Sequence, residues 1–235
     1  AFTSADGEPG LEEVLDMLAT HPGTARFICT KIARRLLTDD PDSLLIDRLS
    51  ALFLAQSDAP DQIAQVVRAL ALDPAFEQPP TKLRRPFEFL AALYRGSGAS
   101  ISATDNSYRW QLSRAGWLQH TFPPPTGHSD RADDWSTGTG LLRLADYALY
   151  GHDDWFGATE TRLSKLVPPE VKSLDDLMQF WSGKLTGLPE NAPPELLDLM
   201  SLTANEALPR DEGSLHDLSS VILTFAALSP QFMNR

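Results

Sequence analysis

The five histidines are the first candidates for catalysis, because histidine is the side chain whose unperturbed pKa lies closest to neutral pH. Two of them, His120 and His128, share a Pro- and Gly-rich stretch with Asp133 and Asp134. Imidazole and carboxylate groups in one loop can serve as general acid and base. These four residues are therefore the candidate catalytic groups. The alternative interpretation is that the histidines cap turns while the aspartates keep the loop solvated.

The same mixture of imidazoles and carboxylates raises the question of a metal site. No two histidines flank a glutamate at the i, i+4 spacing of a zinc-binding helix, and no other established ligand spacing occurs. A second polar cluster, His152 to Asp154, reads as the end of one helix and the acidic start of the next. We predict no metal site and no cofactor.

Nucleophilic catalysis has little support in the sequence. Cys29, the single cysteine, follows apolar residues and precedes basic ones, which indicates buried volume more than a reactive thiol. No Gly-x-Ser-x-Gly elbow, phosphate-binding loop or dinucleotide fingerprint is present. The Gly96-Ser97-Gly98 stretch is interpreted as a helix exit followed by a flexible turn.

Aromatic residues crowd into the segment from residue 110 to 135. The candidate ligand-binding residues are Trp110, Trp117, Phe122 and Trp135. Flat rings interleaved with prolines can line a groove for a sugar or a peptide. The alternative is that these rings form a miniature core, which a long connection needs in order to be ordered.

Charge and hydropathy exclude several classes of partner. The chain has 32 acidic and 20 basic residues, a net charge of −12, which is the wrong sign for binding nucleic acid or anionic lipid. No apolar run approaches the roughly 18 residues of a membrane span. The local basic cluster at residues 26–35 is expected to pair with nearby aspartates at 39, 40 and 42.

Helical periodicity dominates the elements that must position these residues. Apolar residues recur at i, i+3, i+4 and i+7 in five segments, which begin at Ile63, Phe87, Leu141, Leu174 and Leu218. No strand-like alternation of comparable length occurs. We predict an all-α, multi-helical globular bundle of about ten or eleven helices with one long Pro/Trp-rich loop at residues 116–137.

Local signals mark several helix ends. Ser173 with Asp176 predicts a capping box, and Ser214 is expected to accept N–H bonds at the start of the last long helix. Residues 72–76 and 228–232 share the pattern Leu, Asp or Ser, Pro, any residue, Phe, which indicates a helix closed by proline with an aromatic residue folded back onto it.

A composition break near residues 150–170 suggests two lobes. We expect residues 1–150 to form a helical lobe that includes the loop at 116–137, and residues 151–235 to form a C-terminal helical lobe. No Ser/Gly linker separates them, so the two lobes are expected to pack as one continuous domain.

Several motifs in order along the chain resemble a bacterial family known as domain of unknown function 1800. The resemblance covers essentially the whole chain. It rests on His-Pro-Gly-Thr-Ala-Arg-Phe at 21–27, the helix-closing phrase at 72–76, the Lys82 to Phe89 helix start, the Pro-rich loop before Trp135, and the ending at 228–235. His128 stands where members of the family usually have tryptophan.

The resemblance implies a place in a larger protein and no established activity. Members of the family are commonly about twice this length, which implies that the present chain is a C-terminal half. Relatives are often encoded beside exported proteins with twin-arginine signals, which implies a periplasmic or extracellular location.

Two functional hypotheses follow. The first is a helical interaction or assembly module, whose partner is another protein or the missing N-terminal half. The alternative is an enzyme or carbohydrate-binding protein with its site in the aromatic loop at 110–135. The sequence leaves open whether the chain is an enzyme.

Overall fold

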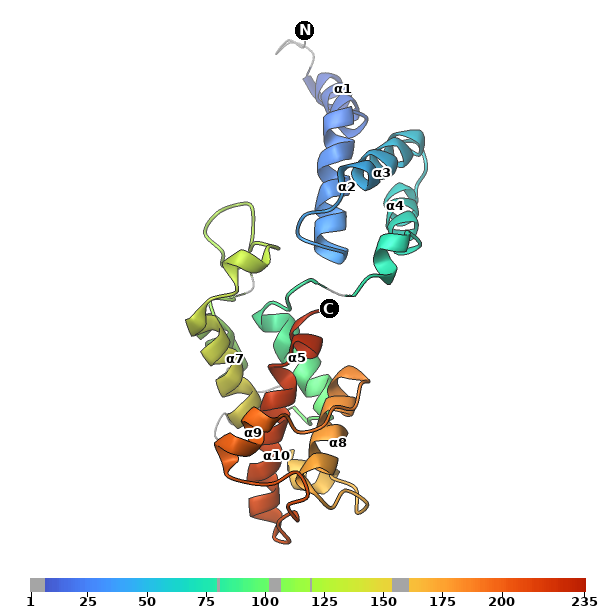
Figure 1. Ribbon diagram of the computed structural model, residues 1–235. Helices are drawn as coiled ribbons and strands as arrows, with labels where there is room; N and C mark the ends of the chain where they lie inside the picture. Colours follow the sequence, from blue (N-terminus) through green and yellow to red (C-terminus); the bar gives the residue numbers. More distant parts are fainter. Residues whose placement is uncertain (1–6, 80, 102–106, 119, 154–160) are drawn as a thin grey trace. The chain divides into compact units, whose positions relative to one another are not determined.

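The computed structural model describes residues 7–79, 81–101, 107–118, 120–153 and 161–235 (Figure 1). Within these residues the chain forms eleven α-helices, ten of them at least seven residues long, together with short 3₁₀ segments and no β-strand. The prediction of an all-α fold with ten or eleven helices is therefore confirmed. In this described part of the chain, no helix combines the length and the apolar character that crossing a membrane requires.

The chain divides into two compact units, residues 1–82 and residues 83–235. Each unit has its own cluster of buried apolar side chains. The lobe boundary expected at residue 150 falls inside the second unit, at the end of a helix, and that division stays a prediction.

Four helices and a 3₁₀ turn make up the first unit. They are α1 (Gly7–Ala19), α2 (Pro22–Leu36), α3 (Ser43–Ala55), α4 (Gln62–Ala71) and η1 (Pro74–Glu77). The face of α2 that packs on α3 consists of small residues, Ala25, Cys29 and Ala33, which let the two helices approach closely. Leu49 and Phe53 of α3 complete the core against α4.

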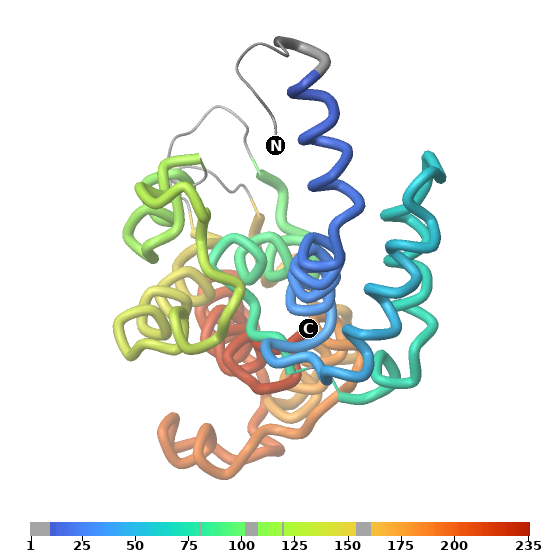
Figure 2. Tube along the Cα trace, turned by 90° about the horizontal axis from the view of Figure 1, so that it is seen from above, coloured from blue at the N-terminus to red at the C-terminus, as the bar shows by residue number. Residues whose placement is uncertain are grey.

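The first helix of this unit lies apart from the others. α1 meets the beginning of α2 at a steep angle, which is clear when Figure 1 is compared with Figure 2. His21 sets the corner, because its Nδ1 accepts the N–H of Gly23 at 3.0 Å and Pro22 occupies the first helical position. Among the described helices of the first unit α1 contacts chiefly α2, and its side chains Leu11, Leu15, Met17 and Leu18 are exposed.

The second unit is built around its last long helix. Its helices are α5 (Pro86–Ser97), α6 (Ser107–Arg114), α7 (Gly138–Tyr150), α8 (Leu174–Thr186), α9 (Pro194–Met200), α10 (Glu212–Ala227) and α11 (Pro230–Met233), with the 3₁₀ segments η2 (Ala132–Asp134) and η4 (Leu163–Leu166). In Figure 1, α10 runs through the middle of this unit, and it packs on α7, α8, η4 and α11.

The composition of α10 explains its central position. Its buried residues include the small side chains Ser219, Ser220 and Ala226, which allow neighbouring helices to pack closely. Ile222 and Leu223 are fully buried and fill the space between these contacts. A helix that is buried on several sides is expected at the centre of a bundle.

Helix starts follow the predicted capping chemistry in one case and depart from it in another. Ser173 and Asp176 form the reciprocal capping box of α8, as predicted. The prediction for Ser214 was wrong, because α10 begins at Glu212 and the Asp211 carboxylate is the cap. Asp211 accepts the N–H of Ser214 at 2.8 Å, so Ser214 is a donor within the first turn.

The C-terminus is fastened to the start of α5. Arg84 donates its backbone N–H to the carbonyl oxygen of Met233 at 2.8 Å and its guanidinium to the carbonyl of Asn234 at 3.0 Å. The same guanidinium lies 4.7 Å from the centre of the Phe232 ring. These contacts hold both ends of the second unit together.

Candidate functional site

Four of the rings in the long loop between α6 and α7 pack against one another. Trp117 and His128 are stacked, with ring centres 4.3 Å apart. Trp135 lies 5.5 Å from Trp117 and 5.7 Å from His128, and Phe122 lies 4.6 Å from His128. The structure thus brings Trp117, Phe122 and Trp135, three of the predicted ligand-binding residues, around His128.

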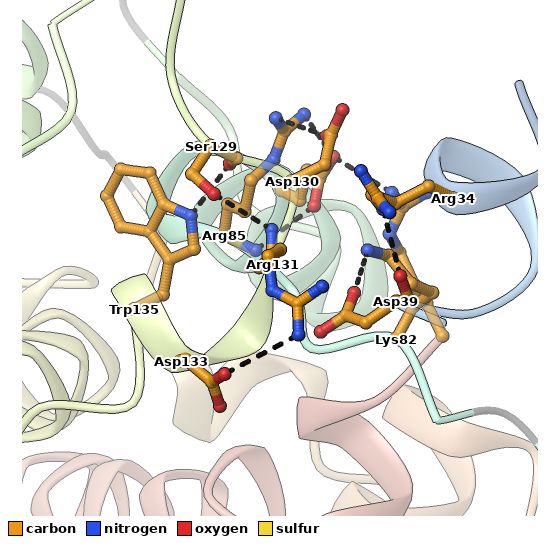
Figure 3. A network of polar contacts seen from close by, with 11 residues as sticks. Arg34, Asp39, Lys82, Arg85, Ser129, Asp130, Arg131, Asp133 and Trp135 are labelled. Carbon is orange, nitrogen blue, oxygen red and sulfur yellow. Dashed lines mark hydrogen bonds and ion pairs between the residues drawn. The ribbon is translucent and has the colours of Figure 1, made fainter. Parts of the chain in front are cut away.

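Backbone carbonyls fix two of these rings. The indole N–H of Trp135 donates to the carbonyl of Ser129 at 2.9 Å, as Figure 3 shows. Nε2 of His128 lies 3.2 Å from the carbonyl of Leu118. Because a carbonyl oxygen only accepts, this nitrogen carries a proton, and the buried Nδ1 of His128 has no hydrogen-bond partner among the described residues.

An arginine links the loop to the beginning of α5. The guanidinium of Arg85 lies 4.6 Å from the centre of the Trp117 ring and donates to Asp130 at 2.8 Å (Figure 3). It also pairs with Glu88 at 2.9 Å. Arg85 is largely buried, and its contacts with two carboxylates and a ring face hold the loop against the start of α5.

The remaining candidates lie away from this ring cluster. Asp133 has a side chain that is 86% exposed and lies 3.7 Å from Arg131 (Figure 3). Asp134 and His120 are exposed, and His120 has a positive φ of 62°. Trp110 is 56% exposed, with the Arg114 guanidinium 4.5 Å from its ring centre. Of the four candidate catalytic residues, only His128 joins the cluster.

A second polar cluster is buried in the core of the second unit. His152, directly after α7, is 1% exposed, and its Nε2 lies 2.8 Å from the hydroxyl of Ser97 at the end of α5. His216 on α10 is 3% exposed. Nδ1 of His216 accepts the backbone N–H of Leu163 at 3.0 Å, so Nε2 carries the proton that it donates to Asp153 at 2.7 Å.

The surroundings of His152 keep its ring neutral. The Ser97 hydroxyl donates to the carbonyl of Tyr94 at 3.3 Å, so Nε2 of His152 is the donor to Ser97 and Nδ1 is an unpartnered lone pair among the described residues. Burial, followed by the neighbouring His216, lowers the pKa of His152 to about 4. Ser97 is fully buried and already donates its proton, which makes it a poor nucleophile.

Ligand-sized space lies elsewhere in the second unit. A cleft of about 370 Å³ beside α8 and α10 is lined by four apolar residues, Met178, Pro193, Phe225 and Leu228, and by four polar ones, Glu190, Asn191, Thr224 and Ser229. None of the predicted site residues lines it. Across the described residues, no three His, Cys, Asp or Glu side chains come together in a group that would hold a metal ion.

The basic residues of the first unit follow the expected pairing only in part. Lys82 forms an ion pair with Asp39, and Arg34 donates to the backbone carbonyl of Asp39 at 2.9 Å (Figure 3). Arg26 pairs with Asp47, an acidic residue outside the expected set. Cys29 is buried, and this burial raises the pKa of its thiol, so the sulfur remains protonated at neutral pH.

Comparison with known protein families places these features in a wider group. The family model described as protein of unknown function (DUF1800) matches residues 2–234. The chain belongs to this family. No curated protein and no solved structure matches the chain.

Within this DUF1800 chain, sequence reasoning missed the Ser97–His152 and Asp153–His216 pairs. The partners are 55 and 63 residues apart, and no fixed spacing announces them. Gly151 carries the one local signal, since a Cβ at this position would collide with the Tyr94 hydroxyl and the Tyr147 carbonyl. The Asp154 part of the cluster considered above lies outside the described residues.

Proposed function

We propose that this chain is a helical interaction or assembly module and forms the C-terminal part of a larger protein. The observation that carries the proposal is the exposed apolar stripe of α1. Leu11, Leu15 and Leu18 follow one another at i, i+4 and i+7 and are 56%, 48% and 49% exposed. These exposures are large for three leucines on one helix face.

A helix of this kind needs a partner to be stable. α1 has 13 residues, and isolated helices shorter than roughly 12–15 residues are marginal in water. Most helical stability in proteins comes from packing of an apolar face, and α1 meets only the start of α2 within the described residues. The stripe is therefore the docking element of the module.

Size measurements on the protein in its source organism test this role. The wild-type chain is expected in a complex larger than its own mass, as measured by size-exclusion chromatography of a native extract. Leu15→Ser combined with Leu18→Ser should shift it toward the mass of the single polypeptide that contains the chain, because the apolar stripe is interrupted. Leu141→Ser with Leu142→Ser, two exposed leucines of α7, is the matched control and should leave the complex unchanged. Equal elution of wild type and the α1 variant would contradict the module.

The placement within a larger protein has a separate test. The motifs that resemble the family, whose members are commonly about twice this length, support this placement. An antibody raised against the chain is expected to detect a polypeptide of roughly twice 25.9 kDa in the source organism. A band at the mass of the present chain alone would contradict the placement.

Exposed rings favour a carbohydrate-binding or enzymatic role of residues 110–135 as the second candidate. Trp110 and Phe122 are 56% and 41% exposed, and flat exposed rings can stack on sugars. Catalysis would fall to His120, His128, Asp133 and Asp134. Titration with oligosaccharides should change the tryptophan fluorescence, and Trp110→Ala should abolish that change. An unchanged signal in wild type would remove this candidate.

A further inference from the structure

Opposite charges are carried by the two consecutive helices α1 and α2. Residues 1–25 contain no lysine or arginine, whereas α1 carries Glu12, Glu13 and Asp16. Between residues 22 and 36 the reverse holds, with four basic residues and no acidic one. An acidic helix is thus followed directly by a basic one.

Both helices also present an apolar surface that the first unit leaves uncovered. On α2, Ala25, Cys29 and Ala33 face the core, while Phe27 on the opposite side is 59% exposed. The Lys31 ammonium lies 5.5 Å from the centre of the Phe27 ring. An exposed phenylalanine beside a lysine on α2 matches the leucine stripe beside glutamates on α1.

Part of this charge has no ion-pair partner within the described part of the unit. Glu12, Glu13 and Asp16 have no cationic partner, and Lys31 has no carboxylate partner, among the described residues. Arg26, by contrast, is already paired with Asp47. An incoming helix of opposite charge would therefore gain new ion pairs along α1 and beside Lys31.

The similar lengths of the two helices suit mutual pairing. α1 and α2 have 13 and 15 residues and are thus about 20 and 22 Å long. Two copies can be related by a two-fold axis that runs parallel to the bisector of the angle between α1 and α2. In that arrangement α1 of the first copy lies antiparallel on α2 of the second, and α2 of the first copy lies antiparallel on α1 of the second. Such an arrangement is closed and self-complementary, as in most homodimers.

We propose that the partner of α1 is a second copy of this chain, which binds through two symmetric, antiparallel α1–α2 contacts of opposite charge. This inference rests on the proposed function and names its partner. Two helix pairs double the area buried by one, toward the roughly 1,200–2,000 Å² of stable interfaces. A homodimer that paired α1 with α1 would instead bring like charges together.

Charge reversal on the two helices tests this pairing. Analytical ultracentrifugation of the purified chain is expected to show a dimer at micromolar concentrations. The α1 variant combines Glu12→Lys, Glu13→Lys and Asp16→Lys, and the α2 variant combines Thr24→Glu and Lys31→Glu. Each variant alone should raise the dimer dissociation constant at least about tenfold, because each then places like charges at the exposed positions of the α1–α2 contact.

Mixing the two variants gives the decisive result. In a heterodimer both helix pairs again join opposite charges, so an equimolar mixture should regain the dimer. Asp58→Lys with Glu77→Lys, two exposed changes elsewhere in the first unit, should leave the wild-type dimer intact. Circular dichroism confirms that each variant is folded.

The outcomes separate this inference from the proposed function. A monomeric wild-type chain, or a mixture that stays monomeric, overturns the self-pairing. If the complex in native extract still depends on Leu15 and Leu18, the module then binds a different protein. If the complex in native extract is also unchanged by Leu15→Ser with Leu18→Ser, both proposals fail.

Discussion

Residues 72–76 and 228–232 have nearly the same sequence, one in each unit, and bury their phenylalanines very differently. In both, a leucine ends a helix and a proline starts the next turn, capped by the side chain of Asp73 or of Ser229. Phe76 is nevertheless 42% exposed, whereas Phe232 is 1% exposed and meets the Phe89 ring at 5.5 Å. The local sequence sets the turn, and the surrounding helices set the burial.

The same contrast holds for the units as wholes. The first unit has nine buried apolar core residues and the second has nineteen. Ten large apolar side chains are exposed in residues 7–79, against nine in the described part of residues 83–235, a stretch about twice as long. In proportion to length the two cores are therefore similar, but the first unit exposes about twice as many large apolar side chains.

Separate unfolding of the two units is the largest effect expected from this difference. All five tryptophans belong to residues 83–235, so fluorescence reports only on the second unit, while circular dichroism reports on both. In urea, the helical signal should begin to fall before the fluorescence changes, because the first unit is stabilised by less buried apolar surface than the second. Coincident transitions would show that the units unfold together and would contradict the lower stability of the first unit.

Truncation of the central helix should destabilise the second unit strongly. Leu223 of α10 is fully buried, so Leu223→Ala should lower the free energy of unfolding by about 2–5 kcal/mol. The measurement is the urea midpoint of tryptophan fluorescence. Leu142→Ala, at a side chain that is 68% exposed, should change it by no more than about 0.5 kcal/mol. Similar losses for both would mean that α10 is not the centre of the core.

Acid should weaken the second unit through His152. Burial lowers its pKa from 6.5 to about 4, so between these values the unfolded chain binds a proton that the folded chain does not. Stability is therefore complete above pH 6.5 and declines as the pH falls toward 4, by about 3 kcal/mol in total.

A substitution isolates this contribution. His152→Asn should flatten the dependence of the fluorescence-detected urea midpoint on pH in that range, whereas His120→Asn, at an exposed position, should retain the wild-type slope. Hydrogen bonds from backbone N–H groups lower the pKa of Asp176 and Asp211 from 3.8, so their contributions to stability begin to fall near about pH 5 and are lost mainly at lower pH. An unchanged slope in His152→Asn would assign the acid sensitivity to other groups.

Much of the local structure was predictable from the sequence. Helix periodicity at segments such as Leu174–Trp181 and capping at Ser173 depend on neighbours within a few residues. Both can therefore be predicted from the sequence alone. The candidate residues Trp117, His128 and Trp135 were found for the same reason, since they are close in the chain. Their mutual stacking is the alternative that the sequence had left open.

Only the tertiary structure decided which polar groups are buried together. Ser97 contacts His152 and Asp153 contacts His216 because α7 packs on both α5 and α10. Contacts between residues so far apart in the chain produce no spacing pattern in the sequence from which they could be predicted. The sequence by itself determined the helices and their amphipathic faces. Whether a given face is covered depends on which other helices reach it, and the described helices of the first unit leave the leucine stripe of α1 exposed.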